Sequence, residues 1–227
     1  LFMALILAAV RVVPALGVDP IDRVALVGRH NPIVRKADAL TPFTLGNGGF
    51  AFSVDVTGLQ TFADFHDKGI PLCTQSYWGW HSFPNPDNYR LEDTLVGFET
   101  YGRLVKYPTN MKSKAAEWLR SNPHRLNLGR VGLELAKSDG SPVAVEDLKD
   151  IDQTLDLWSG LLTGRFKVEG SPVEVYTCCH PELDAMAFRI TSPLISARRL
   201  NVTIRFPYGS GRFGKEPGDW DHPELHE

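Results

Sequence analysis

The chain has 227 residues, of which 43% are hydrophobic and 22% charged, and its formal net charge is −3. This composition excludes a disordered chain and is typical of a globular protein. The small negative charge and the lack of a basic patch argue against nucleic-acid binding, which depends on contacts to phosphates. Three cysteines, two of them adjacent, form neither a disulfide framework nor a zinc-binding pattern.

The first 17 residues have the features of a signal peptide that is truncated at its start. Residues 1–13 are apolar apart from Arg11, a run too short to span a bilayer but suited to a signal-peptide core. Ala15 and Gly17 supply the small residues that signal peptidase reads. We therefore expect cleavage at or near Gly17, secretion or a periplasmic location in a bacterium, and no membrane segment afterwards. The alternative is that this run is a buried helix or strand.

The residues that follow predict short strands joined by turns. Residues 19–31 predict a lead-in segment. The glycine-rich turn at residues 46–49 precedes an alternation of apolar with small or polar side chains at residues 50–57, which predicts a half-buried strand. Residues 64–89 lack periodicity and predict a long, structured loop. Residues 112–121 hold good helix formers and end before Asn122-Pro123, which predicts one short helix.

The last third of the chain has the most regular pattern. Alternating runs at residues 165–169 and 173–177, separated by Gly170-Ser171-Pro172, predict a hairpin. Residues 131–135, 186–190 and 200–206 predict three more strands, the last with a wholly apolar face. Many strands and one convincing helix favour a mostly β fold, an antiparallel β super-sandwich over residues 18–227.

Motifs for catalysis and metal binding are weak. The chain has no phosphate-binding loop and no nucleophile elbow, and we expect no cofactor. The carboxylate pairs Glu92/Asp93 and Asp219/Asp221 are of the kind that glycoside cleavage uses, but surface charge is the simpler interpretation. His222 and His226 have helical ligand spacing, but a proline follows the first, and we expect no metal there.

The aromatic segment at residues 77–86 (Tyr-Trp-Gly-Trp-His-Ser-Phe-Pro-Asn-Pro) is the strongest candidate for a ligand site. Sugar rings stack on indoles, while their hydroxyl groups need polar partners, and concave sites combine both. We therefore expect Trp78, Trp80, His81 and Asn85 to contact a carbohydrate, with at most one of the two tryptophans packed inward. The alternative is that both tryptophans belong to the core.

Four segments give the chain a resemblance to a known family. They are Leu45–Gly48 (Leu-Gly-Asn-Gly), Arg120–Arg130, Gln153–Gly160 (Gln-Thr-Leu-Asp-Leu-Trp-Ser-Gly) and His180–Asp184 (His-Pro-Glu-Leu-Asp). In this order they resemble the N-terminal super-sandwich of glycoside hydrolase family 65 and related six-hairpin glycosidases. Arg120–Arg130 is similar to a segment of secreted bacterial members of that wider group. The resemblance covers most of residues 31–208.

In that family the sandwich precedes an (α/α)6 barrel that carries the catalytic glutamate and the phosphate site. The resemblance therefore implies a non-catalytic N-terminal domain of a secreted carbohydrate-active enzyme, whose partners are the sugar substrate and its own C-terminal barrel beyond Glu227. It also implies that the catalytic residues lie outside this chain and that loops such as residues 77–86 help to close the active site. Two other functions stay open: a free-standing carbohydrate-binding module, and a secreted structural or interaction domain without a sugar ligand.

Overall fold

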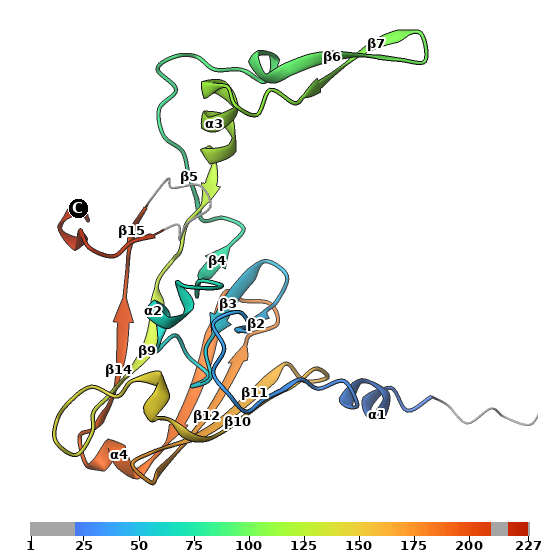
Figure 1. Cartoon of the computed structure of the whole chain (residues 1–227). Coiled ribbons are helices and arrows are strands. Elements are labelled where there is room, and N and C mark those ends of the chain that lie inside the picture. Colours follow the sequence, from blue (N-terminus) through green and yellow to red (C-terminus); the bar gives the residue numbers. More distant parts are fainter. Residues whose placement is uncertain (1–20, 210–217, 227) are drawn as a thin grey trace, which may run out of the picture.

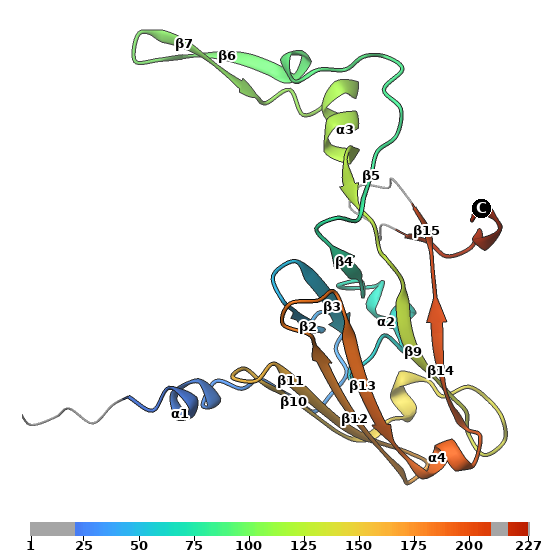
Figure 2. The same ribbon diagram turned by 180° about the vertical axis from the view of Figure 1, so that it is seen from behind.

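The computed structural model describes residues 21–209 and 218–226, and within them the chain forms antiparallel sheets (Figure 1). A five-stranded sheet in the order β1-β10-β11-β12-β13 forms one layer. The three-stranded sheet β2-β3-β4 and the pair β14-β9 pack against it from the other side (Figure 2). This arrangement confirms the predicted mostly β, antiparallel sandwich. The predicted signal peptide lies outside the described residues.

The described strands are β1 (Ile33–Val34), β2 (Phe43–Gly46), β3 (Phe50–Val54), β4 (Thr74–Ser76), β5 (Trp80–His81), β6 (Leu95–Thr100), β7 (Arg103–Pro108), β8 (His124–Arg125), β9 (Arg130–Leu135), β10 (Lys149–Asp156), β11 (Leu161–Val168), β12 (Ser171–Cys179), β13 (Met186–Thr191), β14 (Leu200–Arg205), β15 (Tyr208–Gly209) and β16 (Gly218–Asp219). The described helices are α1 (Arg23–Gly28), α2 (Ala63–His66), α3 (Lys114–Ser121), α4 (Pro193–Ser196) and the 3₁₀ turns η1 (Leu91–Thr94), η2 (Val145–Asp147) and η3 (Pro223–Leu225). None of these described helices has the length and apolarity that a membrane span requires.

The main core forms where the apolar faces of the alternating strands meet. The predicted hairpin is β11–β12, and it buries Phe166, Val168, Val173 and Val175. These side chains pack with Leu133 of β9 and its neighbours from the opposite layer. Burial of one such side chain contributes about 1.5–3 kcal/mol, so this face holds the two layers together.

The second core cluster lies under the hairpin β2–β3, where Phe50, Phe52 and Val54 are buried as the alternation predicts. The predicted glycine turn joins these two strands. A Cβ atom on Gly46 would lie 2.2 Å from the carbonyl oxygen of Phe50, so the tight turn requires glycine there. The turn therefore fixes the register in which Phe43 faces Val54.

The loop after β3 departs from the predicted pattern. The alternation places Asp55 on the solvent face, but its side chain is buried. Its carboxylate accepts hydrogen bonds from the backbone nitrogen and the hydroxyl of Thr57 (2.8 and 2.6 Å) and from the backbone nitrogen of Phe62 (2.6 Å). Gln153 of β10 donates to the Asp55 carbonyl oxygen (2.8 Å). Burial raises the pKa of Asp55 above its ordinary value, while the hydrogen bonds from Thr57 and Phe62 to the carboxylate oppose the rise.

The sequence predicts one continuous loop over residues 64–89. The structure differs, because α2 overlaps the start of this range and β4 and β5 form within it. The lead-in segment likewise contains α1, whose N-cap Asp22 accepts from the backbone nitrogen of Ala25. These elements span only two to six residues, which is too short to show a period. The predicted helix at residues 112–121 is α3, capped by the Ser113 hydroxyl.

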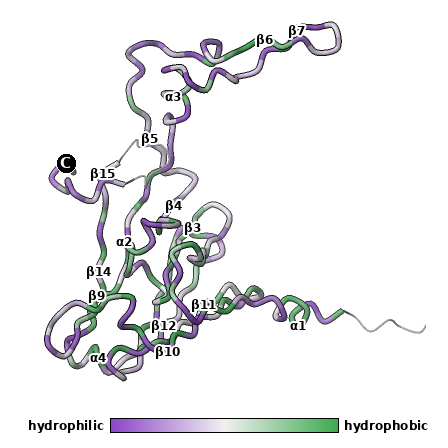
Figure 3. The backbone as a smooth tube through the Cα atoms, in the orientation of Figure 1, coloured by the Kyte–Doolittle hydropathy of each residue, from purple (hydrophilic) through white to green (hydrophobic). Residues whose placement is uncertain are grey.

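Residues 80–125, here called the arm, project away from the sandwich (Figure 1). The arm is closed at its base by the short ladder β5–β8 and carries the hairpin β6–β7 at its outer end. The hydrophobic colour of β6 stands out along this hairpin (Figure 3). Val96, Phe98 and Tyr107 share one of its faces and are all exposed.

The apolar face of β14 was expected to turn inward, and only Leu200 does so. Val202, Ile204 and Phe206 are 52%, 62% and 66% exposed. Leu200 packs in the main core, whereas the rest of β14 continues past the end of that core. Because β14 pairs only with β9, no further strand of this sheet covers the later side chains.

Replacing Asp55 by asparagine should lower the free energy of unfolding by about 2–3 kcal/mol, because the amide nitrogen would face the buried donor of Thr57 or Phe62. Urea denaturation at neutral pH measures the change. Asp152→Asn, on the exposed side of β10, is the matched control and should change stability by less than about 0.5 kcal/mol. Equal stability of the two variants would show that the Asp55 carboxylate does not hold this loop.

Candidate functional site

Three segments that are distant in sequence meet at one end of the sandwich: the β2–β3 turn, the β4–β5 segment and the β12–β13 connection. Asn47 in the turn donates its side-chain amide to the carbonyl oxygens of His180 (3.3 Å) and Leu183 (3.1 Å). Its side-chain oxygen accepts from the backbone nitrogens of Gly49 and Phe50. Asn47 thus joins two of the segments that carry the family resemblance.

Asp184 ties the β4–β5 segment to the same place. Its Oδ2 atom accepts hydrogen bonds from the Ser76 hydroxyl and from the Trp78 indole Nε1, both at 2.6 Å. These bonds lower the pKa of Asp184 below its ordinary value, so the carboxylate is ionised at neutral pH. The side-chain amide of Asn47 also contributes to this lowering, and the Asp184 side chain is exposed.

Tyr77, Trp78 and Trp80, here called the aromatic platform, are 62%, 60% and 49% exposed. Both tryptophans therefore lie outside the core, which rules out the alternative that they are core residues. The indole nitrogen of Trp80 donates to the Tyr77 carbonyl oxygen (2.5 Å). A Cβ atom on Gly49 would lie 2.8 Å from the Tyr77 ring, so glycine there lets this ring lie across the turn. The polar atoms hold the rings in place and leave ring faces open to solvent.

Arg125 completes the site from the base of the arm. It is the cross-strand neighbour of Trp80 in the β5–β8 ladder, and its guanidinium lies 4.6 Å from the centroid of the Trp80 ring. Together with Gln75, Tyr77 and the glycine turn, Arg125 lines a hollow of about 330 Å³. The site therefore combines stacking surfaces, one anionic acceptor in Asp184 and one cation.

The other two predicted site residues, His81 and Asn85, make contacts within the arm. His81 packs its ring against Phe83 (4.7 Å between centroids) and His124 (5.3 Å). Asn85 exchanges two hydrogen bonds with the backbone of Tyr89, at 2.9 and 3.0 Å. Both side chains shape the arm, and these contacts do not join them to the platform.

Sequence reasoning missed Asn47, Tyr77, Arg125 and Asp184 as parts of the site. Three of them lie in segments that carry the family resemblance: Leu45–Gly48, Arg120–Arg130 and His180–Asp184. Their polar side chains in glycine- or proline-containing segments were the available signal. The contacts that assemble the site span 106 residues from Trp78 to Asp184 and up to 136 from Asn47, and alternation does not report such distances.

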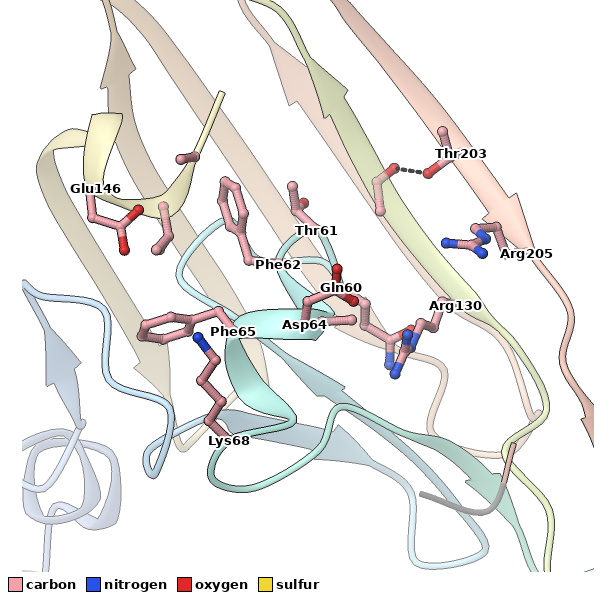
Figure 4. Close-up of a pocket in the computed structure, with 14 residues that line it drawn as sticks. Gln60, Thr61, Phe62, Asp64, Phe65, Lys68, Arg130, Glu146, Thr203 and Arg205 are labelled. Atoms are coloured by element: carbon pink, nitrogen blue, oxygen red, sulfur yellow. Dashed lines mark hydrogen bonds between the residues drawn. The ribbon is translucent and has the colours of Figure 1, made fainter. Parts of the chain in front are cut away.

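A larger hollow of about 420 Å³ lies between α2 and the pair β9–β14 (Figure 4). Several of its polar side chains form contacts within the fold. Gln60 Oε1 accepts from the backbone nitrogen of Val131, and Thr203 donates to the carbonyl oxygen of Gly132. Arg130 lies 3.7 Å from Asp67 and stacks on Trp220. Charges of both signs line this hollow and define no ligand class.

The remaining sequence candidates are occupied locally. His222 Nδ1 lies 2.9 Å from a carboxylate oxygen of Asp219, and the Asp93 carboxylate accepts from the backbone nitrogen of Arg90. No disulfide joins any of the three cysteines, all of which lie in the described ranges. Within the described ranges, no group of three His, Cys, Asp or Glu residues is arranged to hold a metal ion.

Comparison with known proteins gives no assignment. No protein-family model matches the chain, and no curated protein matches its sequence. The resemblance to glycoside hydrolase family 65 therefore stays a prediction from the motifs. The structure adds that two of these segments, Leu45–Gly48 and His180–Asp184, meet through Asn47.

Asp184→Asn should destabilise the chain at neutral pH and reduce its sensitivity to acid. Because the folded pKa of Asp184 is lowered, the ionised carboxylate stabilises the fold above the unfolded pKa of about 3.9, and this contribution is lost as the pH falls through the folded value. The difference in unfolding free energy between parent and variant should therefore shrink below about pH 4. Urea denaturation from pH 7 to pH 3 tests this. Glu182→Gln in the same connection is the control, and a difference that does not vary with pH would refute the role of the charge.

Proposed function

We propose that this chain is a non-catalytic, carbohydrate-binding β-sandwich domain of a secreted carbohydrate-active enzyme. The observation that carries the proposal is the aromatic platform: three large, exposed aromatic side chains within four consecutive residues, with both indoles fixed by hydrogen bonds. Soluble proteins seldom expose grouped aromatics without a partner. Fixed aromatic rings favour binding because little side-chain entropy is lost when a ligand covers them.

The polar groups around the platform suit sugar hydroxyls. The ionised carboxylate of Asp184 is exposed, and its oxygens accept hydrogen bonds and cannot donate. A sugar ring that stacks on Trp78 has hydroxyl groups at its edge, and the Asp184 carboxylate lies at the edge of that indole. The arrangement supports binding by stacking together with a charge-assisted hydrogen bond.

The same carboxylate argues against catalysis at this site. A glycosidase needs one carboxylic acid with a raised pKa and a second carboxylate across the scissile bond. The pKa of Asp184 is lowered, the opposite of what a general acid requires. This supports the expectation that catalytic residues belong to another domain.

The exposed apolar surfaces support the expected protein partner. The hairpin β6–β7 exposes Val96, Phe98 and Tyr107, and Ile204 of β14 and Phe206 just after it are exposed as well. An isolated two-stranded hairpin is marginally stable in water, so a covering surface would stabilise the arm. We propose that the catalytic domain of the same enzyme supplies this cover. A free-standing binding module would leave these apolar surfaces uncovered.

Trp78→Ala and Trp80→Ala should each weaken glycan binding roughly 5–30-fold, because each removes a stacking surface. The probes are maltopentaose, cellopentaose, xylopentaose and oligogalacturonate, titrated by calorimetry into the 227-residue chain. Trp78→Phe keeps a ring face and loses the bond to Asp184, so it should retain more affinity than Trp78→Ala. Trp158→Ala, at a tryptophan 53% exposed outside the platform, is the control.

Melting temperatures separate binding from folding. The exposed positions predict shifts of only about 1–2 °C for the alanine variants. A large loss of thermal stability with unchanged affinity in the folded fraction would show that the rings serve the fold. Failure of every probe to bind the parent chain would count against carbohydrate binding itself.

A further inference from the structure

Arg125 differs from Arg165 and Arg199, two arginines that form ion pairs in the sandwich. Arg165 and Arg199 lie within ion-pair distance of Glu174 (2.7 Å) and Glu169 (2.5 Å). No carboxylate in the described part of the chain lies within that distance of Arg125. Its guanidinium lies over the face of Trp80, a contact that orients the group without neutralising its charge.

The hollow beside this guanidinium is open and shaped by the backbone. The β2–β3 turn forms one wall, and a Cβ atom built on Gly48 would meet nothing within 4 Å. Gln75 and Tyr77 supply polar groups at the other walls. The described lining residues include no aspartate or glutamate, so Arg125 is the charged side chain among them.

We infer that the hollow binds the carboxylate of a uronic acid residue in the bound glycan; this inference rests on the proposed carbohydrate-binding function. Arginine presents paired N–H donors in a planar fork that matches the two oxygens of a carboxylate. Stacking on Trp80 holds that fork in one plane before the ligand arrives, which reduces the entropy lost on binding. The platform binds the sugar ring, and Arg125 selects the acidic one.

The test compares each acidic oligosaccharide with its own neutral derivative. Oligogalacturonate, oligomannuronate and xylo-oligosaccharides bearing glucuronate are titrated into the 227-residue chain beside their methyl esters, in which the ring is kept and the charge removed. At least one acid form should bind about tenfold or more tightly than its ester, because the bond is charge-assisted. Added salt should reduce this preference.

Variants of Arg125 locate the effect. Arg125→Gln should abolish the preference for the acid form, so that acid and ester bind with affinities within about twofold of each other. Arg125→Lys should keep part of the preference, because it retains the charge without the planar fork. Melting curves show that each variant is folded. An Arg125→Gln variant that still prefers the acid form would overturn the inference.

The outcomes separate the two proposals. Esters and acids that bind equally, with affinity lost in Trp78→Ala, would overturn the uronate inference and leave carbohydrate binding intact. Tighter binding of a sulfated galactan oligosaccharide than of any uronate would overturn the assignment to a carboxylate. If no saccharide binds, both proposals fail together.

Discussion

The buried carboxylate of Asp55 joins the two layers of the sandwich. Its three hydrogen bonds fold residues 55–62 into a compact loop. The loop then reaches both sides: Gln153 of β10 binds the Asp55 carbonyl, and Gln60 exchanges hydrogen bonds with Val131 of β9. Burying a carboxylate costs free energy unless donors surround it. Here the three donors offset that cost. The loop that they stabilise holds β9 in place against the five-stranded sheet.

At the surface, the candidate site is also held together by polar side chains. Asp184 and Asn47 are polar side chains that join loops rather than strands, and each bridges segments more than 100 residues apart. The strands set the spacing of these loops, and the polar bridges set the orientation of the rings. A platform of this kind is stiff because its supports belong to different hairpins. Under the proposed function, this stiffness favours ligand binding, because rings that are already held in place lose little side-chain entropy.

Alternation in the sequence predicted the parts of the fold where one face meets the core. The hairpin β11–β12 and the strand β3 follow that rule because each packs on an opposite layer. The rule fails at Asp55, which is buried through hydrogen bonds, and at Ile204, which is apolar but extends past the core. Of the predicted site, Trp78 and Trp80 lie on the platform. Asp184 and Arg125 could not be placed there, because strand pairing and loop contacts bring them in from distant parts of the sequence.

The platform crosses the joint between the sandwich and the arm. Trp78 is tethered to the β12–β13 connection through Asp184, whereas Trp80 belongs to β5, whose pairing with β8 closes the base of the arm. A ligand that covered both rings, such as the proposed glycan, would therefore fix the angle at which the arm leaves the sandwich. The same coupling would act in reverse, because a partner that held the outer hairpin would change the affinity for that ligand by an equal free energy. The position of the platform would thus couple ligand binding to any contact that the arm makes.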